Sequence, residues 1–194
     1  MENLQNIESV LSKINELKIA GYDRIHLPGG TAKDGSYYSG AIVVTMDPIT
    51  KEVYFLGVPY NSHFHIGSEN GHNKKFGEFP EQTVIRELLE ETGLQAISSD
   101  LELVLNKKIP DNRPGKVGQY HQKFFYLITE FTGNLFTFEG ANPIDGETAA
   151  PIWIPASLFI KVLFGGHLEA VYAAIEELNL ISRDYAYSLM NLLR

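Results

Sequence analysis

Two kinds of segment, an amphipathic helix and several strand-like runs, predict that this protein has an α/β fold. Residues 81–92 place apolar side chains at helical spacing. Residues 39–46, 53–58 and 120–128 are rich in the β-branched and aromatic residues that strands favour. A chain of 194 residues can bury one full-sized core. We therefore expect a single α/β domain that spans residues 1–194.

The N-terminal part predicts a helix and then a turn. Residues 5–17 have the apolar spacing of an amphipathic helix, and Gly21 follows them. This helix would pack either on the domain or on a second subunit, so a homodimer is one of two open arrangements. In residues 25–31 an apolar run precedes a glycine pair. No Gly-Lys-Ser/Thr follows the pair, which favours a plain turn over a phosphate-binding loop.

The strands at 39–46 and 53–58 flank the turn-forming residues 47–51 and predict a β-hairpin. A polar stretch with three histidines comes next, at residues 61–72. His63 and His65 alternate as strand neighbours and have the chemistry to bind a transition metal, but the spacing identifies no third ligand. We expect packing or hydrogen-bonding roles for them rather than a metal site.

The C-terminal half predicts further strands, loops and helices. Residues 101–109 read as a strand, and residues 110–118 form a turn-rich basic loop that is either a substrate contact or a solvated surface. A polar loop at 142–150 precedes a short strand at 152–154, in which we expect Trp153 to lie in the core. Helical patterns end the chain at residues 155–164, 168–178 and 185–193.

Composition excludes several classes of protein. Hydrophobic residues at 44% and charged residues at 21% are ordinary globular values, and the absence of cysteine excludes disulfides, thiolate zinc sites and a catalytic thiol. A formal charge of −8 argues against duplex nucleic acid as a partner. No apolar run approaches the roughly 20 residues that span a bilayer, and the N-terminus has no signal-like region, so we expect a cytoplasmic protein without a membrane partner.

The helix at residues 81–92 is the segment that carries chemistry. Pro80 suits its first turn, and Gly93 suits the left-handed position after its last. Apolar residues 84, 85, 88 and 89 share one face. Like charges on a helix repel by a few tenths of a kcal/mol per pair, so a cation is expected beside the three carboxylates of the other face. Mg²⁺ takes a few carboxylates together with waters and substrate phosphates. These carboxylates belong to Glu87, Glu90 and Glu91.

The same residues resemble a known motif. Glu78, followed after seven residues by Arg86-Glu87-Leu88-Leu89-Glu90-Glu91-Thr92-Gly93-Leu94, resembles the Nudix hydrolase signature, G-x5-E-x7-R-E-U-x-E-E-x-G-U with U a bulky aliphatic. One position departs from this pattern, because the opening glycine of the signature falls on His72. Gly77 and Glu78 lie in the loop of the motif, and Gly93 is its C-terminal glycine.

The resemblance implies a fold and a division of the chain. The expected fold is the Nudix α/β/α sandwich with a mixed sheet. The Nudix core would span residues 36–160, with an N-terminal helical extension at 1–30 and C-terminal helices at 161–194.

The resemblance also implies an activity, namely metal-dependent hydrolysis of the diphosphate bond in a nucleoside diphosphate linked to another moiety, such as a nucleotide sugar or ADP-ribose. Mg²⁺ or Mn²⁺ would be the cofactor, held by Glu87, Glu90 and Glu91. The general base would be one of these three or Glu147, with Asp145 the second candidate from the same loop.

Arg86 would pair with Glu78 and fix the loop of the motif against the helix. Arg113 and Lys116 are candidates for binding the phosphates of a small nucleotide-type substrate, since arginine matches phosphate geometry well. Two alternatives remain at this point. The carboxylates form a solvated face with an ordinary Arg–Glu pair, or the protein is a Nudix-fold nucleotide-binding or sensor protein without catalysis, which His72 favours.

Overall fold

The computed structural model describes residues 37–60, 63–72, 79–110, 118, 120–136 and 150–189. Several predictions fall outside these ranges and stay predictions. They concern the helix at 5–17, the turn at 25–31, and the site residues Gly77, Glu78, Arg113, Lys116, Asp145 and Glu147.

Strand β1 (Tyr37–Met46) is the centre of a mixed sheet. It pairs in parallel with β7 and antiparallel with β2 and β4. The predicted hairpin, the strand at 101–109 and the strand at 120–128 are all present. The sheet order is β3-β2-β1-β7-β6, with β4 beside β1 and β9 beside β2. These strands are β2 (Val53–Tyr60), β3 (His63–His65), β4 (Ser68–His72), β6 (Leu101–Pro110), β7 (Tyr120–Ile128) and β9 (Ile152–Pro155).

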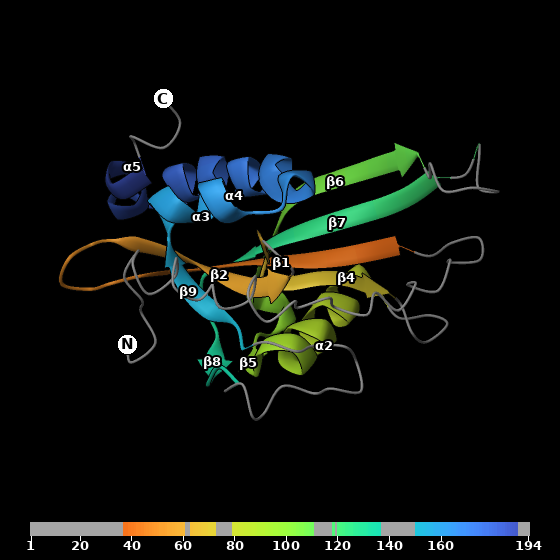
Figure 1. Ribbon diagram of the computed structural model, residues 1–194, viewed down its shortest axis with the longest axis horizontal. Coiled ribbons are helices and arrows are strands. Elements are labelled where there is room, and N and C mark those ends of the chain that lie inside the picture. The colour runs from red at the N-terminus through yellow and green to blue at the C-terminus, as the bar shows by residue number, and fades with distance from the viewer. Residues whose placement is uncertain are drawn as a thin grey trace.

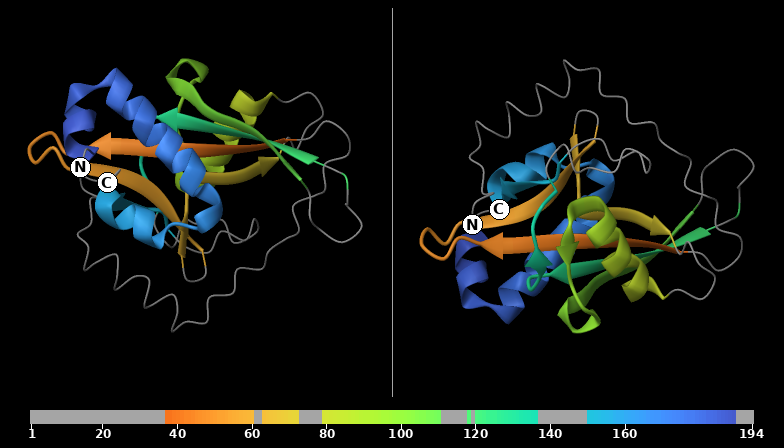
Figure 2. Two further views of the ribbon diagram at one scale, coloured as in Figure 1. Left: turned by 90° about the horizontal axis from the view of Figure 1, so that it is seen from above. Right: turned by 90° about the horizontal axis from the view of Figure 1, so that it is seen from below.

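Helices cover both faces of this sheet (Figure 1). Helix α2 (Pro80–Thr92) lies on one face, close to the small ladder of β5 (Leu94–Gln95) and β8 (Thr132–Gly133). Figure 2 shows the C-terminal helices on the opposite face. They are α3 (Ala156–Val162), α4 (Leu168–Ile181) and α5 (Arg183–Leu189).

The strands alternate between two hydrophobic cores, because successive side chains of a strand point to opposite faces. Ile42, Phe55 and Phe125 join the core under the C-terminal helices. Their neighbours Val43 and Tyr126 join the core under α2. Both faces are therefore buried, which confirms the predicted α/β/α sandwich with a mixed sheet.

The ends of the C-terminal helices differ slightly from the prediction. Helix α4 continues to Ile181, beyond the expected end at residue 178, and α5 begins at Arg183 rather than at residue 185. Helix α3 ends at Val162, before the expected end at residue 164, and a 3₁₀ turn, Gly165–His167, leads into α4. Trp153 is buried as expected. No helix in the described ranges combines the length and the apolar character needed to cross a bilayer.

Candidate active site

Helix α2 begins and ends where the sequence predicts, because local contacts fix both ends. Pro80 occupies the first turn, and the Phe79 N–H donates to the Gln82 side-chain oxygen at 2.9 Å. Gly93 ends the helix with a left-handed φ of 80°, and its N–H donates to the Leu89 carbonyl. The Thr92 hydroxyl donates to the Leu88 carbonyl at 2.6 Å. These caps hold the carboxylates of α2 at a defined position along its axis.

The packed face of α2 differs from the expected one. Val84 and Leu88 are fully buried, as predicted, but Leu89 is 40% exposed. The buried stripe extends instead toward Thr83 and Glu87. Residues 85 and 89 lie about 100° to one side of the line through residues 84 and 88, and residues 83 and 87 lie about 100° to the other side. Helix geometry therefore does not decide which side is buried. The docking of α2 on the sheet decides it. As a consequence, Glu87 is only 7% exposed.

Arg86 compensates the buried carboxylate of Glu87. Its Nη1 atom donates to Glu87 Oε1 at 2.5 Å and to Glu90 Oε2 at 3.0 Å. A carboxylate is costly to bury unless it is paired and hydrogen-bonded. The Arg86–Glu90 contact is the i,i+4 pair that an ordinary solvated face would also form. The burial of Glu87 is not a property of such a face, and Arg86 links the Glu87 carboxylate to that of Glu90.

A tyrosine that the motif does not contain anchors the first turn of α2. Tyr126 of β7 is 2% exposed, and its hydroxyl donates to Glu81 Oε1 at 3.0 Å. Burial, and then the hydrogen bond to Glu81, raise the pKa of Tyr126. Strand alternation is the only sequence signal that places Tyr126 on this face, and it does not name Glu81 as the partner.

Comparison with known proteins rests on the fold. No family model matches the sequence, and no curated protein matches it. Solved structures do match. A MutT protein from Bacillus halodurans is 19% identical over 71% of this chain and 79% of its own, with a TM-score of 0.53. A MutT/Nudix family protein from Enterococcus faecalis is 15% identical over 95% and 75%, with a TM-score of 0.55. This chain has the Nudix fold.

Within the Nudix fold, His72 is the last residue of β4 and pairs with Tyr38 of β1. The residue that replaces the opening glycine of the signature therefore has strand backbone at the point where the chain leaves the sheet toward α2. Gly93, the closing glycine of the signature, needs its left-handed conformation. The structure thus explains the closing glycine by backbone geometry and places His72 in a ladder that accepts any non-proline residue.

The carboxylates of the Nudix helix have the chemistry of a Mg²⁺ site. Glu87, Glu90 and Glu91 offer hard oxygen ligands within one turn, and Mg²⁺ needs only a few of these because waters and phosphates complete its shell. In the present arrangement the cation beside Glu87 and Glu90 is the Arg86 guanidinium. Among the described residues, no three histidine, aspartate or glutamate side chains converge to hold a metal ion.

The histidines lie on the opposite face of the Nudix sheet. His63 and His65 of β3 have their Nε2 atoms 3.1 Å apart, and the His167 ring packs edge-on against His65 with centroids 5.2 Å apart. Burial, and then the nearby charge of Lys123, lower the pKa of His167 to about 3. His63 and His65 therefore take the packing role that the sequence favours for them, and His167 joins them. The sequence did not reveal His167 as their neighbour, because its contact with β3 is purely tertiary.

Proposed function

We propose that this protein is a metal-dependent Nudix hydrolase that cleaves the diphosphate bond of a nucleoside diphosphate linked to another moiety, such as a nucleotide sugar or ADP-ribose. The observation that supports this most is the buried Glu87, joined through Arg86 to Glu90 on a helix that is capped at both ends. A solvated helix face gains nothing from burying a carboxylate, whereas a metal site needs carboxylates held in place.

Each side chain has a proposed role. Glu87, Glu90 and Glu91 would hold Mg²⁺ or Mn²⁺. When bound, such an ion neutralises charge on the diphosphate and lowers the pKa of a bound water. One of these carboxylates, or Glu147, accepts the proton of the attacking water. Arg86 keeps the carboxylates of Glu87 and Glu90 in position through its ion pairs with them.

The remaining proposals concern the substrate and the chain as a whole. Arg113 and Lys116, in the loop between β6 and β7, would bind the phosphates of a small nucleotide-type substrate. The formal charge of −8 disfavours duplex nucleic acid. We place the protein in the cytoplasm as one domain of residues 1–194, in which residues 1–30 pack on the domain or on a second subunit.

The deciding experiment is a panel of nucleoside diphosphate derivatives with Mg²⁺ and with Mn²⁺, whose products are separated by chromatography. We expect hydrolysis that EDTA abolishes. Mutation of a residue that only supports a metal ligand typically costs about 10- to 100-fold in activity. Glu90 and Glu91 are proposed as ligands themselves, so Glu90→Gln and Glu91→Gln should each lower kcat by at least that factor. The control is Glu176→Gln, an exposed glutamate on α4, which should leave kcat unchanged.

The alternative function is a Nudix-fold nucleotide-binding or sensor protein, which the His72 departure from the signature favours. Tight nucleotide binding without turnover in any metal would establish it and would reject the hydrolase. Equal rates in Glu91→Gln and the Glu176→Gln control would also reject the proposed roles of the carboxylates.

A further inference from the structure

Lys123 of β7 is a partly buried cation that the described residues leave without an acidic partner. No carboxylate in the described part of the chain forms an ion pair with it. Its ammonium group lies 5.5 Å from the centre of the Tyr38 ring. Lys123 is partly buried, and the resulting loss of hydration lowers its pKa. A cation removed from water requires compensation, and a single tyrosine ring supplies only about 1 kcal/mol of it.

The neighbouring lysine offers a direct contrast. Lys107 of β6 is the register partner of Lys123, so the two side chains share one face of the sheet. Lys107 forms an ion pair with Glu169 in the first turn of α4. Among the residues that the structure describes, an acidic side chain therefore neutralises Lys107 and none neutralises Lys123.

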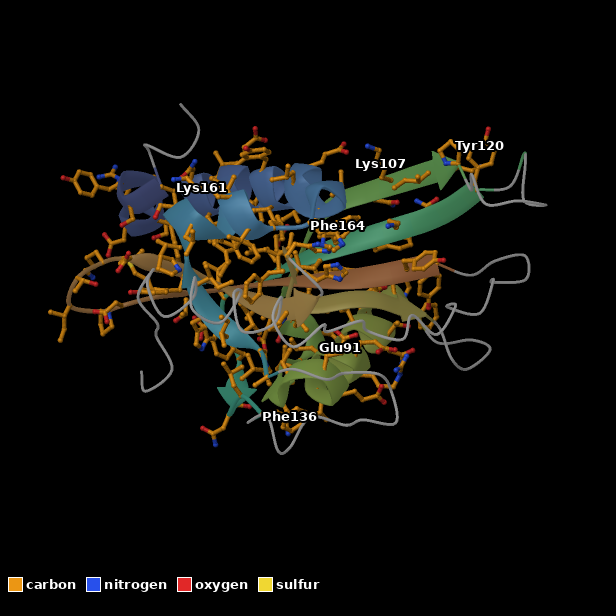
Figure 3. The ribbon with its side chains drawn as sticks, in the orientation of Figure 1. Glu91, Lys107, Tyr120, Phe136, Lys161 and Phe164 are labelled. Carbon is orange, nitrogen blue, oxygen red and sulfur yellow. The ribbon has the colours of Figure 1, made fainter. Side chains whose placement is uncertain are left out.

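The face that Lys123 shares with Lys107 is the one opposite the Nudix helix. On β7, Lys123 is two residues from Phe125 of the core under α4 and so shares its face, whereas Tyr126 faces α2. Figure 3 shows Lys107 and Phe164 on the side of the sheet that carries α4, and Glu91 on the side of α2. A group bound at Lys123 would thus be separate from the carboxylates of α2.

Several aromatic and histidine rings pack together on the face of the sheet that carries α4. His167 is close enough for the Lys123 charge to affect its pKa, and it packs against Phe125 and Phe164. Phe164 also stacks on His63, with centroids 5.1 Å apart. A hydrogen bond of 2.8 Å from the Phe164 N–H to the Phe64 carbonyl ties this segment to β3. Phe164 is 42% exposed and His167 is 1% exposed, so a ligand would reach the Phe164 ring, with His167 buried beneath the surface.

The register connects this surface with the loop that leads to the Nudix helix. Tyr38 of β1 pairs with His72 on one side and with Lys123 on the other. Neighbouring strands lie about 4.8 Å apart, so the backbones of His72 and Lys123 are separated by about 10 Å. His72 is the last described residue before that loop. The backbone of Lys123 is therefore two strands away from the residue at which the chain leaves the sheet toward α2.

We propose that Lys123, with the Tyr38 ring beside it and His167 nearby, forms an anion-binding site for a carboxylate or phosphate group on the moiety attached to the diphosphate of the substrate. The identity of the substrate in this inference rests on the proposed function. The binding of an anion at Lys123 does not depend on it. It names a substrate class: nucleoside diphosphates whose attached moiety carries a negative charge of its own.

The first test measures anion binding without catalysis. Inorganic phosphate is titrated into the EDTA-treated protein at constant ionic strength, and the ring resonances of His167 and His63 are followed by NMR. We expect saturable shifts at millimolar phosphate in the wild type and in Lys107→Met, and none in Lys123→Met. Lys123→Arg, which keeps the charge, should restore the shifts. Absence of saturation in the wild type, or an unchanged titration in Lys123→Met, would overturn the anion site.

The second test asks whether the anion belongs to the substrate. Matched pairs that differ in one anionic group, such as UDP-glucose with UDP-glucuronate and NADH with NADPH, are compared by kcat/KM. A hydrogen bond to a charged group corresponds to about 10- to 100-fold. We expect the charged member of the hydrolysed pair to be favoured by that factor, and Lys123→Met to abolish the preference. Turnover without such a preference would overturn the substrate class while the hydrolase stands.

A protein that binds phosphate but hydrolyses none of the substrates would give the opposite result to turnover without an anion preference. In that case the anion site is real, and the proposed hydrolase is wrong. The two proposals therefore fail separately. Thermal unfolding of each variant, measured alongside, identifies any loss of binding that comes from loss of folding.

Discussion

At the scale of single residues, burial and backbone conformation decide what a side chain can do. Glu87 and Glu90 are alike in sequence, but the packing of α2 buries the first and leaves the second partly exposed. Gly93 shows the same dependence for the backbone. Its φ of 80° is a conformation that non-glycine residues adopt at a cost of roughly 1–2 kcal/mol. Its surroundings then determine the additional cost of any side chain.

We expect Gly93→Ala to lower the free energy of unfolding by at least ~2 kcal/mol, because strain and a clash add together. A Cβ atom at this position would lie 2.5 Å from the Asn134 carbonyl oxygen. Gly118→Ala is the matched control, since φ is 86° there and nothing lies within 4 Å of the added Cβ. It should cost only about 1 kcal/mol of strain. Urea denaturation measures both, and equal losses would contradict the clash.

At the scale of elements, α2 is held on the sheet by contacts of two kinds. Val84 and Leu88 supply apolar burial, which positions the helix without fixing its rotation. The hydrogen bond between Tyr126 and Glu81 is directional and fixes the first turn. The carboxylates of α2 take their orientation from both contacts.

Removal of this hydrogen bond is expected to lower stability in a pH-dependent way. Tyr126→Phe should cost about 1 kcal/mol at neutral pH. Because the folded pKa of Tyr126 is raised, the unfolded chain releases its proton first, near pH 10, and wild-type stability falls as pH rises above that value. Tyr126→Phe should show a shallower alkaline decline in urea denaturation. Tyr120→Phe, at an exposed tyrosine, serves as control. If its stability declined at alkaline pH as little as that of Tyr126→Phe, the decline could not be assigned to Tyr126.

At the scale of the whole molecule, two cores share one sheet, and the core under α4 contains titratable groups. His167 is 1% exposed, with Lys123 as the nearby charge that further lowers its pKa. Burial also lowers the pKa of His63. A buried histidine is neutral in the folded state and gains a proton on unfolding in mild acid.

This predicts an acid-sensitive fold. Histidine in the unfolded chain titrates near pH 6.5, whereas the folded pKa of His167 is about 3. Between these values the unfolded state binds the extra proton, so stability falls as pH falls, by up to about 1.4 kcal/mol per pH unit for one proton. Urea denaturation between pH 7 and pH 5 measures the slope before most carboxylates titrate. His167→Gln should flatten it, and an unchanged slope would refute the role of His167.

The sequence determined the features that local physics controls. Pro80 and Gly93 fix the ends of α2 through their own backbone preferences, and period-2 alternation fixes the strands and their two faces. The spacing of Glu87, Glu90 and Glu91 follows from helix geometry alone. These contacts lie within one or two turns of the chain, so no distant residue is needed to form them.

Only the tertiary structure decided which side of α2 is buried, that Tyr126 bonds Glu81, that His167 joins the β3 histidines, and that Glu169 neutralises Lys107 rather than Lys123. Each of these depends on how separate elements dock, where several partners satisfy the same local pattern. Packing selects one of them, because a buried charge or hydroxyl is stable only beside a specific partner.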